Sequence, residues 1–151
     1  MATSSSPTTP RIVVGVDGSP SSLAALRWSK YLAPLVGAEI EAITTWKVPP
    51  ALLAGSLFDP DVLEQIARST LESAVRDVFD GSVQTKVVQT TREASPVDCL
   101  VEASSSATLV LVGNRGRGGF AGMVIGSVSS AVAAHAHCPV LVVHGDTVPV
   151  G

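Results

Sequence analysis

A glycine-rich stretch in the last third of the chain constrains the possible folds more than any other feature. Residues 113–127 contain six glycines, follow the apolar run 108–112, and precede the small-residue segment 128–134, which can begin a helix. The branched side chains of the apolar run suit a strand that is covered on both faces. Glycines allow close backbone approach, and a helix N-terminus presents unpaired N–H donors with a partial positive charge. The order strand, glycine-rich loop, helix therefore predicts a phosphate-binding site.

Polar side chains within and beside this stretch fit the same chemistry. Ser127 and Ser129 supply hydroxyl donors, and Arg115 and Arg117 supply positive charge. Two alternatives stay open at this point. The arginines can instead be solvated loop charges, and the loop can be a plain connector without a ligand.

The two best-known phosphate loops fit this sequence poorly. A Walker loop requires a Gly-Lys pair, and the chain contains none. Residues 116–121 do spell the G-x-G-x-x-A of a dinucleotide fold, but they follow a late strand rather than the first. No acidic residue stands about 20 residues beyond them, where such folds bind the ribose. We therefore expect neither a P-loop NTPase nor a dinucleotide-binding enzyme.

The rest of the chain alternates between strand-like and helix-like segments. Strands are predicted at residues 11–16, 38–46, 82–89, 108–112 and 140–143, with the polar third strand at a sheet edge. Helices are predicted from Pro20 to about residue 33, where Pro34 should end or kink the helix, and at residues 60–79, 97–104 and 127–135; residues 47–58 are expected to form an irregular loop. This alternation predicts an α/β fold, a doubly wound five-stranded parallel sheet in the order 3-2-1-4-5 with helices on both faces. Ligands of such sheets bind at the carboxyl ends of the strands beside the switch point, here strands one and four.

Length and composition restrict the function further. The 151 residues suit a single domain, predicted at 11–145 between a disordered N-terminal tail at 1–10 and a C-terminal tail at 146–151. The net charge of −3 disfavours nucleic acid as a partner, and no apolar run is long enough to span a membrane. The N-terminal segment lacks the pattern of a secretory signal, and Cys99 and Cys138 are expected to be reduced thiols. Together these features predict a cytoplasmic location.

The glycine spacing resembles that of a known family. Gly113, Gly116 and the pair Gly126-Ser127 match the G-x2-G-x9-G-S/T signature of the ATP-binding universal stress proteins. Further matches occur in order along the chain at 13–19, 37–39 and 138–143. The sequence is thus similar to this family over nearly all of its length after the N-terminal tail.

This resemblance implies a ligand and a set of binding residues. It implies ATP with Mg2+, the metal lying near Asp17, which takes the acidic position of the site; an Asx turn capping the first helix is the competing role for Asp17. Gly15 and Val16 would form a wall beneath the base or sugar, and Thr45 would lie where the family presents strand backbone to adenine. The full set of expected ATP-binding residues is Gly15, Val16, Asp17, Thr45, Val112, Gly113, Arg115, Gly116, Arg117, Gly126, Ser127, Val128 and Ser129.

The resemblance also implies a regulatory homodimer, assembled through the last strand, Val140–Val143.

No general base or activated nucleophile stands out, so we expect a nucleotide-binding module rather than an enzyme. His135 and His137 are spaced wrongly to share a face of a helix, and residues 104–106 have no motif that would supply a His/Asp partner. A phosphorylated receiver domain is disfavoured because no lysine follows the fourth strand. Two alternatives remain: a weak ATPase or phosphotransfer enzyme of the same fold, and a structural stress protein that binds no nucleotide.

Overall fold

The computed structural model describes residues 8–53, 59–81, 84–115, 125–145 and 147–150. Five strands form one parallel sheet in the order β3-β2-β1-β4-β5, which confirms the predicted fold class and strand order. The strands are β1 (Arg11–Gly15), β2 (Glu39–Trp46), β3 (Val87–Glu93), β4 (Leu109–Gly113) and β5 (Val140–Val143). Central β1 pairs with both neighbours, so that Val14 lies beside Ala42 of β2 and Leu111 of β4.

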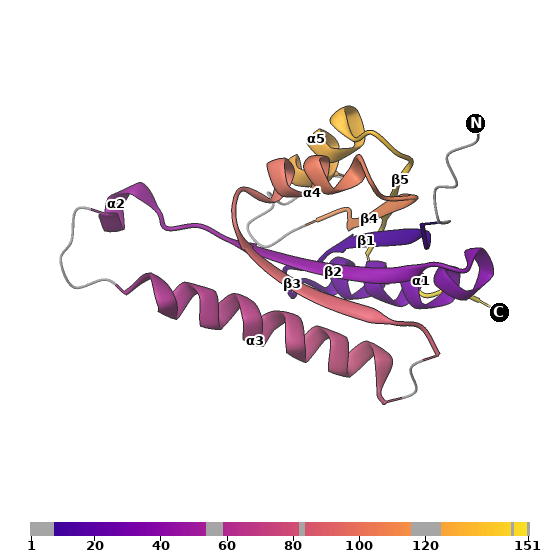
Figure 1. The fold of residues 1–151 in the computed structure, drawn as a ribbon. Coiled ribbons are helices and arrows are strands. Elements are labelled where there is room, and N and C mark those ends of the chain that lie inside the picture. Colours follow the sequence, from indigo (N-terminus) through magenta and orange to yellow (C-terminus); the bar gives the residue numbers. More distant parts are fainter. Residues whose placement is uncertain (1–7, 54–58, 82–83, 116–124, 146, 151) are drawn as a thin grey trace, which may run out of the picture.

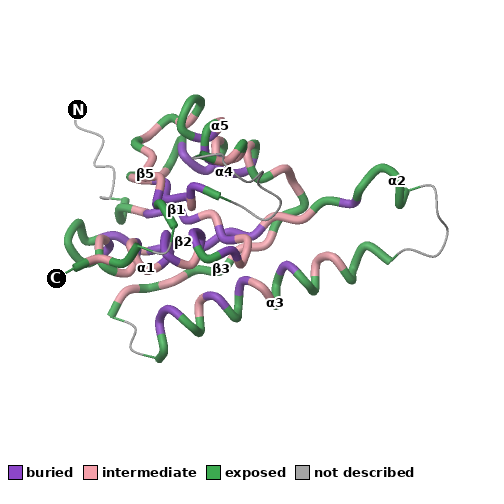
Figure 2. Tube along the Cα trace, turned by 180° about the vertical axis from the view of Figure 1, so that it is seen from behind, coloured by how far each residue is buried: buried purple, intermediate pink, exposed green. Residues whose placement is uncertain are grey.

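Helices cover both faces of the sheet (Figure 1). Helices α1 (Pro20–Val36) and α3 (Pro60–Phe79) lie on one face, and α4 (Pro96–Ser104) and α5 (Ser127–His135) lie on the other. Alternate strand residues supply the two apolar cores: Val14 packs toward α1 and α3, whereas Val13 packs toward α4 and α5. Buried positions therefore follow the strands and the inward sides of these helices, while the short helix α2 (Pro50–Leu53) is exposed (Figure 2).

Three helices begin with a polar cap followed by proline. The caps are Ser19 for α1, Asp59 for α3 and Ser95 for α4, and each side chain accepts a hydrogen bond from a backbone N–H in the first turn. Proline at the first helical position costs no hydrogen bond, because that N–H has no intrahelical acceptor. The cap and the proline together therefore mark the first residue of each of these helices.

Helix α1 does not end at the predicted place. Pro34 lies inside the helix, which continues to Val36 and ends at Gly37 in the left-handed conformation with φ of 66°. Proline removes one helical hydrogen bond, the one to the carbonyl of Lys30. Since Pro34 is exposed, water can satisfy that carbonyl, and the helix tolerates the proline.

Two other predictions about local structure were wrong. The third strand was predicted at 82–89 but lies at Val87–Glu93, because it pairs with β2 from Ile40 to Trp46. Its predicted place at the sheet edge is confirmed. The expected irregular loop at 47–58 contains α2, which begins at Pro50.

The described termini and thiols add three observations. Of the predicted tails, the structure describes 8–10 and 147–150, and the carbonyl of Pro10 accepts a hydrogen bond from the N–H of Glu39 at 2.9 Å. Cys99 and Cys138 are both free, and burial raises the pKa of each thiol. None of the described helices has both the length and the apolar character that a membrane span requires.

Candidate functional site

A cavity of about 460 Å³ lies at the carboxyl ends of β1, β2 and β4, where the strand order reverses. Its volume falls within the range of small-molecule sites. The structure brings eleven of the thirteen predicted site residues to its lining: Gly15, Val16, Asp17, Thr45, Val112, Gly113, Arg115, Gly126, Ser127, Val128 and Ser129. The other two, Gly116 and Arg117, lie outside the described residues.

Eight further lining residues were not singled out from the sequence. They are Ser19, Ser22, Ile43, Trp46, Lys47, Ala94, Pro96 and Leu100. Several come from the end of β2 and from the connection between β3 and α4. A hydrogen bond from the N–H of Ala94 to the carbonyl of Trp46, at 3.0 Å, joins these two segments. A correct placement of β3 would have indicated Ala94 and Pro96, since they follow its carboxyl end.

The start of α5 offers backbone donors to the cavity. Its N-cap is Gly126, which has no side chain to satisfy the first turn, and the first intrahelical bond runs from the N–H of Ser130 to the carbonyl of Gly126 at 3.0 Å. By their position in the helix, the N–H groups of Ser127, Val128 and Ser129 have no intrahelical acceptor. The N–H of Gly126 is used differently, because it donates to the carbonyl of Asn114 at 2.5 Å. The backbone donors that this helix can offer to a ligand are therefore those of its first turn.

The backbone of Arg115 is fixed against the start of α1. Its N–H donates to the Ser21 hydroxyl at 3.3 Å, and its carbonyl accepts from the hydroxyls of Ser21 at 2.5 Å and Ser19 at 3.2 Å. This backbone amide is consequently engaged by the protein itself. The Arg115 side chain is exposed and remains available as a positive charge at the cavity.

Asp17 forms the Asx turn expected before the first helix and also lines the cavity. Its Oδ1 accepts the N–H of Ser19 at 2.8 Å, which is an Asx turn leading into α1. Its own N–H donates to the Ser22 hydroxyl at 3.3 Å. The same residue lines the cavity, so the turn holds a carboxylate at its wall.

The floor of the cavity beside β1 is apolar and has its backbone groups paired. The N–H of Val16 donates to the carbonyl of Ile43 at 2.8 Å, and the Val16 carbonyl accepts from the buried Thr44 hydroxyl at 2.8 Å. Beside it, a Cβ on Gly15 would lie 2.9 Å from Cδ1 of Leu100. Val16 and Gly15 therefore offer a surface rather than hydrogen bonds, which suits an apolar or aromatic part of a ligand.

Ser129 and Asn114 hold the parts of the site together. The Ser129 side chain is buried, and its hydroxyl donates to the carbonyls of Gly126 at 3.1 Å and Asn114 at 3.4 Å. The N–H of Asn114 donates to the carbonyl of Val143 at 2.7 Å, and its Oδ1 accepts the N–H of Gly145 at 2.9 Å. Asn114, which the sequence analysis did not single out, thus joins the exit of β4 to both α5 and the end of β5.

Replacing Asn114 by alanine should lower the free energy of unfolding by about 1–2 kcal/mol. The substitution removes a buried side-chain acceptor and leaves the N–H of Gly145 without its partner. Urea unfolding followed by circular dichroism measures this change. The exposed Ser130→Ala on α5 is the control and should change stability by less than about 0.5 kcal/mol; equal effects of the two substitutions would contradict the role of Asn114.

Among the residues that the structure describes, the charged side chains at the cavity are Asp17, Lys47 and Arg115. Two cations against one carboxylate give the lining a positive balance, which favours an anionic ligand. Among the described residues, no group of three or more His, Cys, Asp and Glu side chains is placed to hold a metal ion. The described part of the site therefore combines an apolar surface, one carboxylate, two cations and the first-turn donors of a helix.

Comparison with known proteins agrees with this architecture. The sequence model of the universal stress protein family matches residues 8–144. A universal stress protein of Mycolicibacterium smegmatis is 38% identical over 145 residues, which cover 89% of this chain and 48% of that protein. The chain spans about half the length of the curated relatives it matches.

Solved structures of the same family share the fold. A universal stress protein crystallised in complex with cAMP is 30% identical, with a TM-score of 0.66 over 91% of this chain and 98% of the other. A universal stress protein from Archaeoglobus fulgidus in complex with dAMP is 23% identical, with a TM-score of 0.63 over 90% of this chain and 98% of the other; at that identity the likeness concerns the fold alone. Since the family model covers nearly the whole chain, this protein belongs to the universal stress protein family.

Proposed function

We propose that the cavity binds an adenine nucleotide, with ATP and its Mg2+ as the main ligand, and that occupancy regulates a response to stress. The observation that carries this proposal is the meeting, in one cavity, of an uncapped helix start, a carboxylate and an apolar floor. These are the groups that a phosphate chain, a ribose and a base respectively require. The complex of a 30% identical universal stress protein with cAMP supports the choice of adenine nucleotides.

The phosphates would lie against the first turn of α5. The N–H groups of Ser127 and Val128 and the exposed Ser127 hydroxyl are the donors, and the Arg115 side chain adds positive charge. Ser129 contributes its N–H, since its hydroxyl already bonds to Gly126 and Asn114. Gly116 and Arg117 remain part of the proposed site on the strength of the sequence motif.

The ribose and the base would occupy the opposite part of the cavity. Asp17 is the carboxylate that can accept hydrogen bonds from sugar hydroxyls, and Thr45 with Val112 lies where the base would enter. Mg2+ supplies charge neutralisation for the phosphates when it is bound with the nucleotide. Asp17 is the described carboxylate at the cavity that would approach it.

Titration calorimetry tests the ligand directly. ATP, ADP, AMP and cAMP are titrated with Mg2+ present, and GTP serves as the control for base recognition. We expect adenine nucleotides to bind at micromolar concentrations, about −8 kcal/mol, and GTP to bind at least about tenfold more weakly. Absence of binding by all four adenine nucleotides at millimolar concentration, together with no nucleotide released from the denatured protein, would favour the structural alternative.

We further propose that the protein binds ATP without turning it over. No described side chain at the cavity pairs with a base in the manner of an activated nucleophile, and Asp17 already accepts the N–H of Ser19. In a single-turnover assay, the wild-type protein and Asp17→Asn should both show rates indistinguishable from spontaneous hydrolysis. A clear rate in the wild type that Asp17→Asn removes would instead establish the weak-ATPase alternative.

The proposal includes a cytoplasmic homodimer joined at β5. This strand lies at one edge of the sheet, and Val140, Leu141 and Val142 are only half-buried, so a second copy can pair with it and cover them. The two free thiols fit a reducing compartment. Sedimentation equilibrium should give twice the mass of the chain, whereas the monomer mass at micromolar concentration would contradict this pairing.

A further inference from the structure

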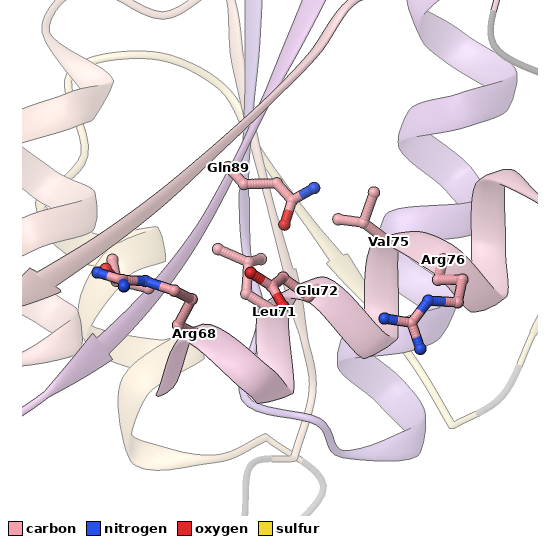
Figure 3. Close-up of a pocket in the computed structure, with 7 residues that line it drawn as sticks. Arg68, Leu71, Glu72, Val75, Arg76 and Gln89 are labelled. Atoms are coloured by element: carbon pink, nitrogen blue, oxygen red, sulfur yellow. The ribbon is translucent and has the colours of Figure 1, made fainter. Parts of the chain in front are cut away.

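A second, open groove lies on the far side of the sheet from β5. It has a volume of about 610 Å³ and runs between α3 and the outer strand β3 (Figure 3). Five residues of α3 between Arg68 and Arg76 line it, together with Gln89 and Thr91 of β3. None of them lines the candidate nucleotide cavity, so the groove is a separate surface.

The backbone of β3 is open on the groove side. β3 is the outermost strand on this side of the sheet among the described residues, and its inner bonds include those from the N–H of Ile40 to the carbonyl of Lys86 and from the N–H of Ala94 to the carbonyl of Trp46. Backbone direction alternates along a strand, so the even-numbered residues of β3 bond to β2. The N–H and C=O groups of Gln89 and Thr91 consequently face outward, where an added strand can bond to them.

The side chains of the groove have a definite order along α3. The partly buried Val75 provides the apolar surface of the groove, whereas Leu71, which also lines it, is 1% exposed and belongs to the core. Arg68 and Arg76 stand at the two ends, eight residues and thus about 12 Å apart along the helix. In an extended peptide, residues four apart lie on one face about 13 Å apart. The spacing of the arginines therefore matches two positions four residues apart on one face of a strand.

The charges of the groove favour an acidic occupant. The Arg76 guanidinium forms no ion pair with any residue that the structure describes, whereas Arg68 pairs with Glu64 at 2.8 Å through a side chain that is 57% exposed. Glu72 lies between the two arginines and disfavours an acid at the central position (Figure 3). A carboxylate at each end of an extended segment, with an apolar residue between them, fits this pattern.

We propose that this groove binds an extended acidic segment of a partner protein, which adds a strand to β3. The backbone of the segment bonds to Gln89 and Thr91, its central apolar side chain packs on Val75, and its two carboxylates pair with Arg68 and Arg76. Main-chain bonds supply affinity in this mode of recognition, and the alternate side chains supply specificity.

A labelled peptide of sequence Thr-Glu-Thr-Val-Thr-Glu-Thr is the probe, with fluorescence anisotropy as the readout. Arg68→Glu and Arg76→Glu should each weaken binding at least about tenfold by charge repulsion, while the control Arg27→Glu on α1 leaves it unchanged. Thr91→Pro should weaken it similarly without unfolding the protein, because that N–H faces away from β2 and edge strands tolerate proline there. Calorimetry with ATP should give the same affinity for all four variants, which separates this test from that of the proposed function.

Amide hydrogen exchange distinguishes strand addition from simple charge attraction. Bound peptide should slow exchange at Gln89 and Thr91 and leave the inward-facing amides of Val88 and Thr90 unchanged. Failure to bind at millimolar peptide, equal binding of a peptide with lysine in place of glutamate, or binding without slowed exchange would each overturn the proposal. Self-association of the protein that Thr91→Pro abolishes would also overturn it, since a second copy would then occupy the groove.

Discussion

Replacing Gly113 by alanine should lower the free energy of unfolding by about 3 kcal/mol or more. A Cβ at this position would overlap the Ser21 hydroxyl and lie 2.6 Å from the carbonyl carbon of Ser21 and 2.7 Å from the N of Ser22. These atoms are backbone of the first turn of α1, which Ser21 fastens to Arg115. They cannot move aside without losing those hydrogen bonds. Urea unfolding monitored by circular dichroism measures the loss.

The matched control is the same substitution at Gly15, the last residue of β1. There the added Cβ would lie 2.9 Å from Cδ1 of Leu100, the end of a side chain that can rotate. Gly15→Ala should therefore cost about 1 kcal/mol or less. Equal losses for the two variants would show that the contact with α1 does not determine the need for glycine at 113.

Gly126→Val should weaken ATP binding at least about 100-fold in a protein that remains folded. The φ of −73° and ψ of 167° at Gly126 are accessible to valine, so the backbone conformation is not the obstacle. The obstacle is space, because a Cβ would lie 3.2 Å from the Asn114 carbonyl and 3.7 Å from the Ser129 hydroxyl oxygen. The branched side chain must displace the start of α5 or fill the cavity. The loss of two hydrogen bonds to charged phosphate oxygens corresponds to this factor or more.

Calorimetry of ATP binding measures the effect, and thermal unfolding checks that the variant is folded. Gly126→Ala provides a graded control, since a single methyl group requires a shift of only a few tenths of an ångström; its affinity should lie between those of the wild type and the valine variant. A folded Gly126→Val protein with wild-type affinity for ATP would count against the placement of the phosphates at α5.

The strand order could be predicted because it depends on features that are local in sequence. Alternating strand and helix signals, with proline after a cap at Pro20 and Pro60, define the crossovers, and the right-handed rule then limits the topology. The position of β3 could not be predicted in this way. It is determined by pairing with β2 between Ile40 and Trp46, and the sequence from 82 to 93 is polar enough for several registers.

The error in β3 also hid part of the candidate site. With the strand predicted to end at Gln89, nothing in the sequence linked Ala94 and Pro96 to the carboxyl ends of the neighbouring strands. The observed end at Glu93 brings both to the cavity beside Trp46. Residues that belong to local motifs, such as Asp17 and Gly126, were found because their signals do not depend on register.

The reason for glycine at position 113 was the feature hardest to predict from the sequence. From sequence, Gly113 suggested close approach to a phosphate; in the structure, the close neighbour of its Cβ position is α1. The serines at the start of α1 showed only a cap signal, yet Ser19 and Ser21 hold the backbone of Arg115. Because such contacts join residues about ninety positions apart in the chain, no pattern within one segment of the sequence can predict them.

Asn114 is hydrogen-bonded both to the start of α5, at the proposed nucleotide site, and to the end of β5, at the proposed dimer interface. Its carbonyl holds the start of α5, and its N–H and Oδ1 hold the last residues of β5 and the turn beyond. A displacement of β5, such as one caused by pairing in the proposed dimer, would therefore reach the proposed phosphate donors of α5 through Asn114 as well as through direct packing. By thermodynamic reciprocity, whatever the dimer does to the affinity for nucleotide, the nucleotide must do equally to the affinity of the dimer.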